Sequence, residues 1–293
     1  MSAASVGADS GASYPKDTNS WSGVNANERL TAGESLKMGE GIFVIDLAER
    51  FSHLSRPPIV EATIHWQARA TADLDIAGLS ATLSRTLPQY VALGPVHQFE
   101  ATLSHNDAGE PVVQQSKGWQ GLRLRSKDQR YAVQFLRNGL VFSRTIGYEN
   151  WTAFMESAKE VWAAFVEIAA PLEIERLGVR FINHFATATP GSVDEFLEEP
   201  PTQPSNLPLK EFVYQSTFAV PGHPFGIRVI KVMQPPAANL QRSSGLFVDI
   251  DVFSTKVIPN ESLALDESLA KMRWLKNKVF FTLLRPDALH AFT

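Results

Sequence analysis

The chain has 293 residues, of which 44% are hydrophobic and 20% charged, a composition typical of a soluble globular protein. Its formal net charge of -4 predicts no general attraction for nucleic acid or for an anionic membrane, and the lack of cysteine excludes disulfides and thiolate chemistry. Because no apolar run approaches the roughly 20 residues of a membrane span and Met1 opens no secretory signal, a cytoplasmic protein without membrane contact is expected.

The first part of the chain is rich in Ser, Ala, Gly and Asn and shows no hydrophobic period, so residues 1–40 are predicted to form a disordered tail. After Pro57-Pro58, which imposes an extended backbone, the residues alternate with the period of a strand. The apolar face of this strand is predicted to consist of Val60, Ala62, Ile64 and Trp66. The polar face would carry Glu61, Thr63 and His65.

Helical spacing next predicts a helix over 76–87, capped by Asp73 or Asp75 and stopped by Pro88. Strands follow near 96–104, 119–126, 130–137 and 139–146, with turn signals at 106–109 and at Asn138-Gly139. The clearest helix begins at Asn150 and ends before Pro171, because one apolar stripe runs along its whole length.

The second half opens with a strand at 174–185. A capping box from Ser192 to Glu195 predicts a short helix, and several prolines between 200 and 208 predict a stiff connector. Strands are expected near 210–220, 225–233 and 245–254, and a final helix over 261–284.

Written as elements, residues 53–171 read β-α-β-β-β-β-α and residues 172–293 read β-α-β-β-β-α, which predicts an internal duplication. Because each helix has a single apolar stripe, the simplest arrangement is an antiparallel sheet with all helices on one face. The predicted fold class is therefore α+β, in one domain over residues 41–293. Its topology would be analogous to the TATA-binding-protein fold or to a helix-grip fold.

Several segments also carry a resemblance to a known family. They are Arg56–Ala62, Leu140–Arg144, Tyr148–Trp151, Arg176–Asn183, Asp249–Phe253 and Leu275–Phe281. In this order they resemble a sporadically distributed prokaryotic family of uncharacterised proteins, from about residue 53 onward. The resemblance implies a bacterial protein with one family-wide domain. A sporadic distribution would suit an accessory system such as phage defence or toxin neutralisation.

The sheet face that the helices leave open is the predicted site. It would carry Glu61, Thr63 and His65 on the first strand, Arg176, Arg180 and His184 on the strand at 174–185, and Asp249 and Asp251 on the strand at 245–254. If the two opening strands lie side by side, Glu61 and Arg180 can pair across them. Such a pair would either fasten the two halves together or recognise an anion.

Two other sites are compatible with the residues. Asp249, Asp251 and Glu61 could bind Mg²⁺ or Mn²⁺ in an enzyme acting on a phosphate or nucleotide, with Arg180 as the anion clamp. Basic residues interleaved with aromatic ones over 119–144 could bind nucleic acid, or could protect a solvated sheet edge by their charge. The basic residues are Arg123, Arg125, Lys127, Arg130, Arg137 and Arg144, and the aromatic ones are Trp119, Tyr131 and Phe135.

The chain has no Gly-x-Ser-x-Gly elbow, phosphate loop, dinucleotide fingerprint or His-Glu-x-x-His motif. Four basic residues of the last helix are expected to complement its dipole: Lys271, Arg273, Lys276 and Lys278. The pattern therefore favours a non-enzymatic binding or regulatory protein without a cofactor or a bound metal. Its open sheet face would engage a protein partner or a small anionic ligand.

Overall fold

A computed structural model describes residues 42–105, 111–234 and 244–293 of the chain, and within these the side chains outside 99–117. The predicted tail at 1–40 and the turn signal at 106–109 lie outside the described residues.

The described strands form one sheet of nine antiparallel strands in the order β2-β3-β4-β5-β1-β7-β10-β9-β8. The strands are β1 (Ile59–Gln67), β2 (Tyr90–His105), β3 (Pro111–Ser126), β4 (Tyr131–Leu136), β5 (Gly139–Arg144), β7 (Arg176–Phe185), β8 (Phe212–Ala219), β9 (Phe225–Gln234) and β10 (Gly245–Ser254). Two short strands, β6 (Glu173–Ile174) and β11 (Ile258–Pro259), pair separately. The predicted α+β class with a large antiparallel sheet is confirmed.

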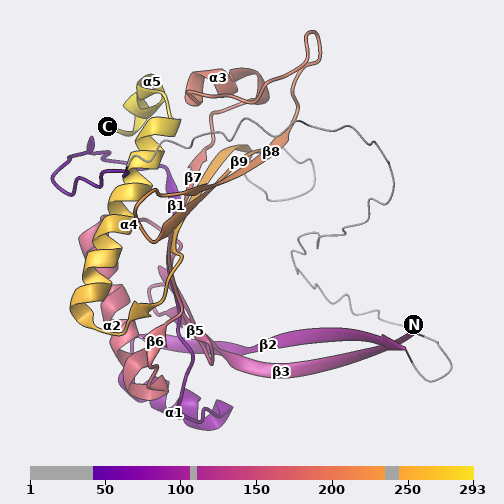
Figure 1. Ribbon diagram of the computed structural model, residues 1–293, viewed down its shortest axis with the longest axis vertical. Helices are drawn as coiled ribbons and strands as arrows, with labels where there is room; N and C mark the ends of the chain where they lie inside the picture. Colours follow the sequence, from indigo (N-terminus) through magenta and orange to yellow (C-terminus); the bar gives the residue numbers. More distant parts are fainter. Residues whose placement is uncertain (1–41, 106–110, 235–243) are drawn as a thin grey trace, which may run out of the picture. The chain divides into compact units, whose positions relative to one another are not determined.

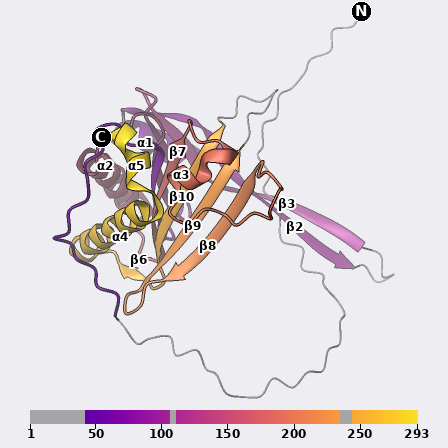
Figure 2. The same ribbon diagram turned by 90° about the horizontal axis from the view of Figure 1, so that it is seen from above.

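The two opening strands, β1 and β7, pair with each other at the centre of the sheet, as predicted. Reading outward, β1 is followed by β5, β4, β3 and β2, and β7 by β10, β9 and β8. In both halves the first strand is therefore central and the last strand lies beside it. Figure 2 shows the strands of the second half next to one another. This shared order supports the duplication, which stays a prediction.

Helices cover one face of the sheet, where α2 (Trp151–Ala169) packs against β5 and α4 (Ser262–Leu283) against β7 and β10 (Figure 1). The other helices are α1 (Ile76–Thr86), α3 (Val193–Phe196) and α5 (Pro286–Leu289), with 3-10 turns at Pro190–Ser192 and His290–Phe292. No helix of the described residues covers the opposite face, which we call the open face. None of the described helices has the length and apolar content that a membrane crossing needs.

Local chemistry explains where the first two helices begin and end. Asp75 caps α1 by accepting from the Gly78 amide at 2.8 Å, and Asn150 caps α2 by accepting from the Ala153 amide at 2.9 Å. Helix α2 ends where Ala170 takes a left-handed conformation with φ 46° and Pro171 follows.

Aromatic side chains join the helices to the sheet. Trp66 of β1 stacks on Trp162 of α2 with the ring centroids 5.2 Å apart, and Phe135 of β4 packs on Phe165 of α2 at 4.9 Å. Trp66, Phe135 and Phe165 are fully buried. Truncating such a side chain to alanine typically costs about 3–5 kcal/mol of stability.

Three local predictions are wrong. Val60 is exposed and not in the core, because the pairing of β1 with β7 shifts register between Ile59 and Glu61. The Ser192 side chain does not cap α3, because its hydroxyl belongs to the capping box of the preceding 3-10 turn and accepts from the Thr189 amide at 3.0 Å. Strands β2 and β3 begin at Tyr90 and Pro111, earlier than predicted, because the two strands continue to pair on both sides of the register shifts at Ala92/Gly94 and Val96/His97.

Candidate functional site

One row of side chains crosses the open face from β3 to β8. The backbone register places each member directly beside the next on the neighbouring strand. In order, the members are Arg125, Ala132, Ser143, Thr63, Arg180, Asp251, Arg228 and Thr217. This central row contains three arginines and one aspartate, with hydroxyl groups between them.

The middle of the central row lies in a hollow of about 470 Å³ formed by β1, β5, β7, β9 and β10. The lining residues are Thr63, His65, Gln67, Val141, Arg176, Gly178, Arg180, Arg228 and Asp251. This volume falls in the range of small-molecule sites, about 300–1,000 Å³. The lining brings together three guanidinium groups and one carboxylate.

Arg180 binds Asp249, and the predicted pair between Arg180 and Glu61 is wrong. The Arg180 Nε lies 2.9 Å from Asp249 Oδ1 and 3.0 Å from Oδ2, and the Nη2 also donates to Oδ2. Glu61 and Asp249 both lie opposite Ile182, one on each side of β7, so Arg180 has a carboxylate diagonal to it on both sides.

Burial explains which carboxylate Arg180 takes. Asp249 is only 8% exposed and needs a counter-charge, whereas Glu61 is half-buried and accepts a hydrogen bond from Thr63 at 3.0 Å. The hydrogen bonds to Asp249 raise the pKa of Arg180, and the charge of Glu61 adds to this more weakly.

A second ion pair joins Arg176 of β7 to Asp251 of β10, with Nη2 and Oδ2 3.0 Å apart. The guanidinium passes over Gly178, where an added Cβ would come within 2.9 Å of Nη1. Glycine therefore leaves the space through which Arg176 reaches its partner. Burial raises the pKa of Asp251 despite the nearby arginines, so holding this carboxylate in the hollow costs desolvation free energy.

The ring of Phe253 on β10 makes cation–π contacts with two arginine side chains. This ring lies over Gly226, where a Cβ would come within 2.5 Å of it. The guanidinium carbon of Arg176 lies 4.8 Å from the ring centroid, and that of Arg228 lies 5.9 Å from it. Arg228 has no acidic partner within 4.0 Å in the part of the chain that the structure describes. It therefore presents a cation at the hollow.

His65 supplies a neutral imidazole. Burial, assisted by the charge of Arg176, lowers its pKa below the ordinary value of 6.5, so the ring is uncharged at neutral pH. Thr63 beside it lies 2.7 Å from the Ser143 hydroxyl, oxygen to oxygen. The edge of the hollow on the β1 side is thus polar but carries no positive charge.

The structure brings most of the predicted open-face residues together. Thr63, His65, Arg176, Arg180 and Asp251 line the hollow, and Asp249 and Glu61 lie next to it. His184 does not join them: its Nε2 lies 2.7 Å from the Ser244 carbonyl oxygen and its ring stacks on Phe247 with the centroids 4.2 Å apart.

Sequence reasoning missed Gln67, Gly178 and Arg228. The period of two continues from His65 to Gln67, and in β9 it places Arg228 opposite to its buried neighbours Ile227 and Val229, so both residues could have been found. Gly178 gave no signal, because its role depends on a side chain that crosses it.

Two of the three carboxylates that were predicted as metal ligands are bound by arginine side chains instead. Asp249 is bound by Arg180 and Asp251 by Arg176, each within hydrogen-bond distance. Within residues 42–105, 111–234 and 244–293 no three His, Asp or Glu side chains are grouped so that they could hold a metal ion.

The basic residues of the nucleic-acid alternative are divided among different surroundings. Arg123 and Arg125 share the open face. Arg144 is buried and bonds to the hydroxyl of Tyr131 and, with Arg130, to Glu149. Arg137 lies 3.8 Å from Asp73, and Lys127 lies on the exposed turn after β3.

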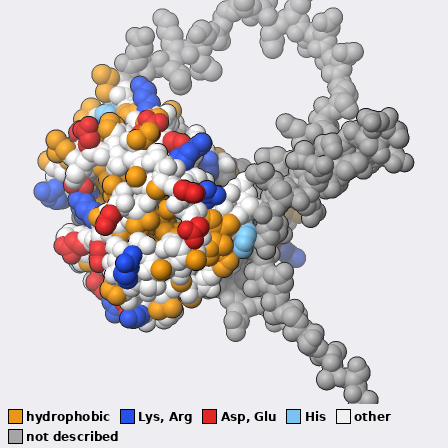
Figure 3. Space-filling view, turned by 90° about the horizontal axis from the view of Figure 1, so that it is seen from below, with side chains coloured by type: hydrophobic (Ala, Val, Ile, Leu, Met, Phe, Trp, Pro, Cys, Tyr) orange, Lys and Arg blue, Asp and Glu red, His pale blue; other side chains and the backbone are white. Residues whose placement is uncertain are grey.

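Two of the three aromatic residues of that alternative pack inside the protein, and the third, the half-buried Trp119, has the guanidinium carbon of Arg137 5.8 Å from its ring centroid. Phe135 is fully buried against Phe165, and Tyr131 stacks on Phe142 with the centroids 5.1 Å apart. On the surface seen from below, basic and acidic side chains are interspersed around apolar ones (Figure 3).

A scan against protein-family models finds no match to this chain. A search of curated proteins finds no significant match either. The resemblance to a prokaryotic family therefore stays a prediction.

Proposed function

We propose that this protein is a non-enzymatic binding or regulatory protein whose open face takes a ligand bearing carboxylate or phosphate groups. The observation that carries the proposal is the excess of guanidinium groups in the hollow: Arg176, Arg180 and Arg228 line it, against Asp251 as the single lining carboxylate. We also propose that the protein belongs to a bacterial accessory system, and this part of the proposal is based on the family resemblance alone.

The arrangement suits recognition of an anion. Asp249 and Asp251 hold Arg180 and Arg176 at fixed positions, which reduces the conformational entropy that binding would otherwise cost. A guanidinium presents its donors in a planar fork that matches a carboxylate or a phosphate. Arg228 is the member whose charge the described residues leave uncompensated, so it is the expected first contact of the ligand.

Titration of the full chain with a hexaglutamate peptide and with inorganic phosphate, followed by calorimetry, tests the proposal. We expect Arg228→Gln to weaken binding about tenfold, since a hydrogen bond to a charged group contributes about 1.5–3 kcal/mol. Arg85→Gln, on the exposed side of α1, is the matched control and should bind as the wild type does.

The affinity should also fall as the salt concentration rises, because screening weakens exposed charges. Failure of both probes to bind, or equal affinities of Arg228→Gln and the wild type, would show that the hollow is not an anion site. Binding of the peptide alone would assign the open face to an acidic protein segment, and binding of phosphate as well would assign it to small anions.

A further inference from the structure

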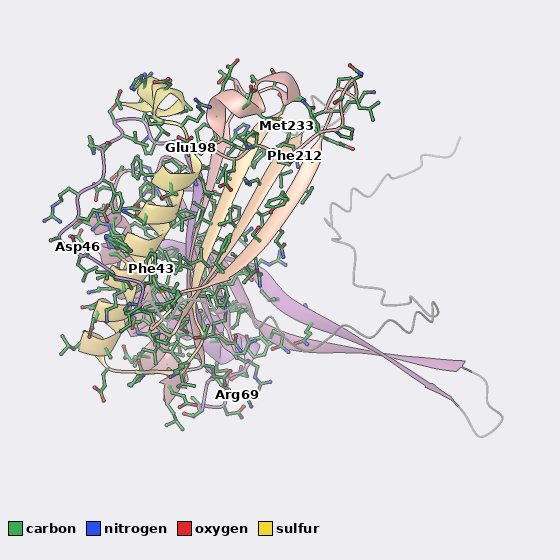
Figure 4. The ribbon with its side chains drawn as sticks, turned by 45° about the horizontal axis from the view of Figure 1, so that its top comes forward. Phe43, Asp46, Arg69, Glu198, Phe212 and Met233 are labelled. Carbon is green, nitrogen blue, oxygen red and sulfur yellow. The ribbon has the colours of Figure 1, made fainter. Side chains whose placement is uncertain are left out.

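A second cavity lies on the helix side of the sheet. It measures about 430 Å³, is partly open to solvent, and is lined by the segment 47–59, by residues 148–151 before and at the start of α2, and by α4. Phe43 and Asp46, which lead into this segment, lie beside α4 (Figure 4). Phe43 packs on Trp274 of α4 with the centroids 6.0 Å apart, and Phe51 stacks on Phe281 at 5.5 Å. These contacts hold the segment over the cavity.

Lys276 is the unusual residue of this cavity. The sequence predicts that it complements the dipole of the last helix from the surface, but the structure buries it to 9% exposure. It follows Met272 and precedes Phe280 at four-residue intervals, on the buried face of α4. Its Nζ lies 4.0 Å from the centroid of Phe181, and the described residues provide no carboxylate for it.

The charged groups that line the cavity leave it positive. Both lining carboxylates are bound by other cations, Glu49 by Lys278 at 2.7 Å and Glu149 by Arg130 and Arg144. Apart from Tyr148, the remaining ionisable groups of the lining are basic: Arg50, His53, Arg273 and Lys276. Arg273 is itself exposed and lies over Trp151, so it occupies the mouth of the cavity.

This environment keeps the amine of Lys276 in its reactive form. Burial, with a smaller contribution from the charge of Arg273, lowers its pKa from 10.5 to about 7. At neutral pH a large fraction is therefore the free base, which is the nucleophilic form. Tyr148 packs on the same Phe181 ring, 5.4 Å between centroids, and burial raises its pKa, so its hydroxyl remains a hydrogen-bond donor.

We infer that Lys276 captures a small carbonyl compound that carries an acid group, as a Schiff base, with Arg273 binding the acid group at the mouth. The lone pair of the amine forms a bond to the carbonyl carbon while the π electrons of the carbonyl move to oxygen, and a proton moves from nitrogen to that oxygen to give a carbinolamine. The nitrogen lone pair then forms the carbon–nitrogen double bond as the carbon–oxygen bond breaks, and the hydroxyl group leaves as water with the second proton of the amine. The steps need neither an oxidant nor a reductant, and the reverse reaction releases the ligand.

Reductive trapping tests the inference. The full chain is incubated with sodium cyanoborohydride and either 4-oxobutanoate or butanal, the matched aldehyde without a carboxylate, and the modified lysines are mapped by peptide mass spectrometry. We expect one main adduct, on Lys276. It should form about tenfold faster with 4-oxobutanoate than with butanal, since a charge-assisted contact contributes about 1.5–3 kcal/mol. Arg273→Gln should remove that difference.

Control variants and the pH profile separate this site from ordinary surface labelling. Lys276→Met should abolish the main adduct, and Lys271→Met, on the same helix and paired with Glu267, should leave it unchanged. Labelling of Lys276 should rise with pH through about 7 and then level off, whereas exposed lysines continue to gain reactivity.

Because Lys276→Met alters a buried position, the mapping of the wild-type chain decides the question even if that variant does not fold. Labels spread evenly over exposed lysines would overturn the inference. Binding of 4-oxobutanoate at the cavity without formation of an imine that cyanoborohydride can reduce would also overturn the inference, since the cavity would then be a site for anions only.

Discussion

Arg180 illustrates how burial decides between two equivalent partners. Register places Glu61 and Asp249 at matching positions on its two sides, and the local sequence offers no reason to prefer either. Asp249 is nearly buried and has the larger need for a counter-charge, so the guanidinium lies on it. The prediction that Arg180 pairs with Glu61 across the opening strands was therefore wrong, because the ion pair joins β7 to β10 instead.

Neutralising each carboxylate in turn should reveal this preference. Asp249→Asn is expected to lower the free energy of unfolding by about 1–2 kcal/mol, because a partly buried charge-assisted bond is lost. Glu61→Gln keeps its hydrogen bond to Thr63 and should cost less than about 0.5 kcal/mol. Urea unfolding at neutral pH measures both, and equal losses would contradict the assignment.

The amine of Lys276 should make the stability depend on pH. Its pKa is about 7 in the folded chain and near 10.5 when exposed, so between these values the unfolded chain binds more protons. The free energy of unfolding therefore rises with pH across this window, by at most about 1.4 kcal/mol per pH unit. Below about pH 7 the amine is charged in both states and the slope disappears.

Lys276→Met lacks this titration, so urea unfolding of both chains at several pH values isolates the contribution of the lysine. The variant should show a flatter profile between about pH 7 and about pH 10 than the wild type. Parallel profiles would mean that Lys276 is solvated in the folded chain.

Helix α2 shows how an element is delimited by its ends as well as by its apolar stripe. The stripe and the start at Asn150 were readable from the sequence, and both are confirmed, whereas the structure alone shows that the Asn150 side chain caps the helix. The left-handed conformation at Ala170 was not predicted, because an alanine there is unusual and Pro171 alone suggested the stop.

Replacing alanine by glycine is expected to have opposite effects on stability at the end of α2 and in its interior. Ala170→Gly should raise the free energy of unfolding by about 0.5–1 kcal/mol, because glycine adopts φ 46° without strain. Ala163→Gly, exposed within the same helix, should lower it by about 1 kcal/mol. Thermal unfolding followed by far-UV circular dichroism tests both, and a loss of stability in the two variants alike would be inconsistent with strain at Ala170.

On the scale of the whole molecule, the pairing of β1 with β7 makes one sheet out of two halves. Because the central strands of both halves bury their apolar faces in one continuous core, neither half can unfold without exposing the other. Urea unfolding should accordingly show a single transition, with coincident curves from tryptophan fluorescence and far-UV circular dichroism. Two separated transitions would mean that residues 41–293 contain two independent domains.

The sequence by itself determined the elements and most of the open-face residues. Strand alternation and helical spacing are local patterns, so they predict which side of β1, β7 and β10 is polar without knowledge of the neighbours. Local patterns also predicted a cap at Asp73 or Asp75, of which Asp75 caps α1, and the order of elements in each half.

Only the tertiary structure decided which of these residues meet. The register across nine strands aligned Arg125, Arg180 and Arg228 in one row, although 103 positions separate the first from the last. Burial selected Asp249 over Glu61, and the absence of a side chain at Gly178 opened a path for Arg176. The buried amine of Lys276 likewise depends on a distant segment that closes over α4, because desolvation is a property of all the packed neighbours together.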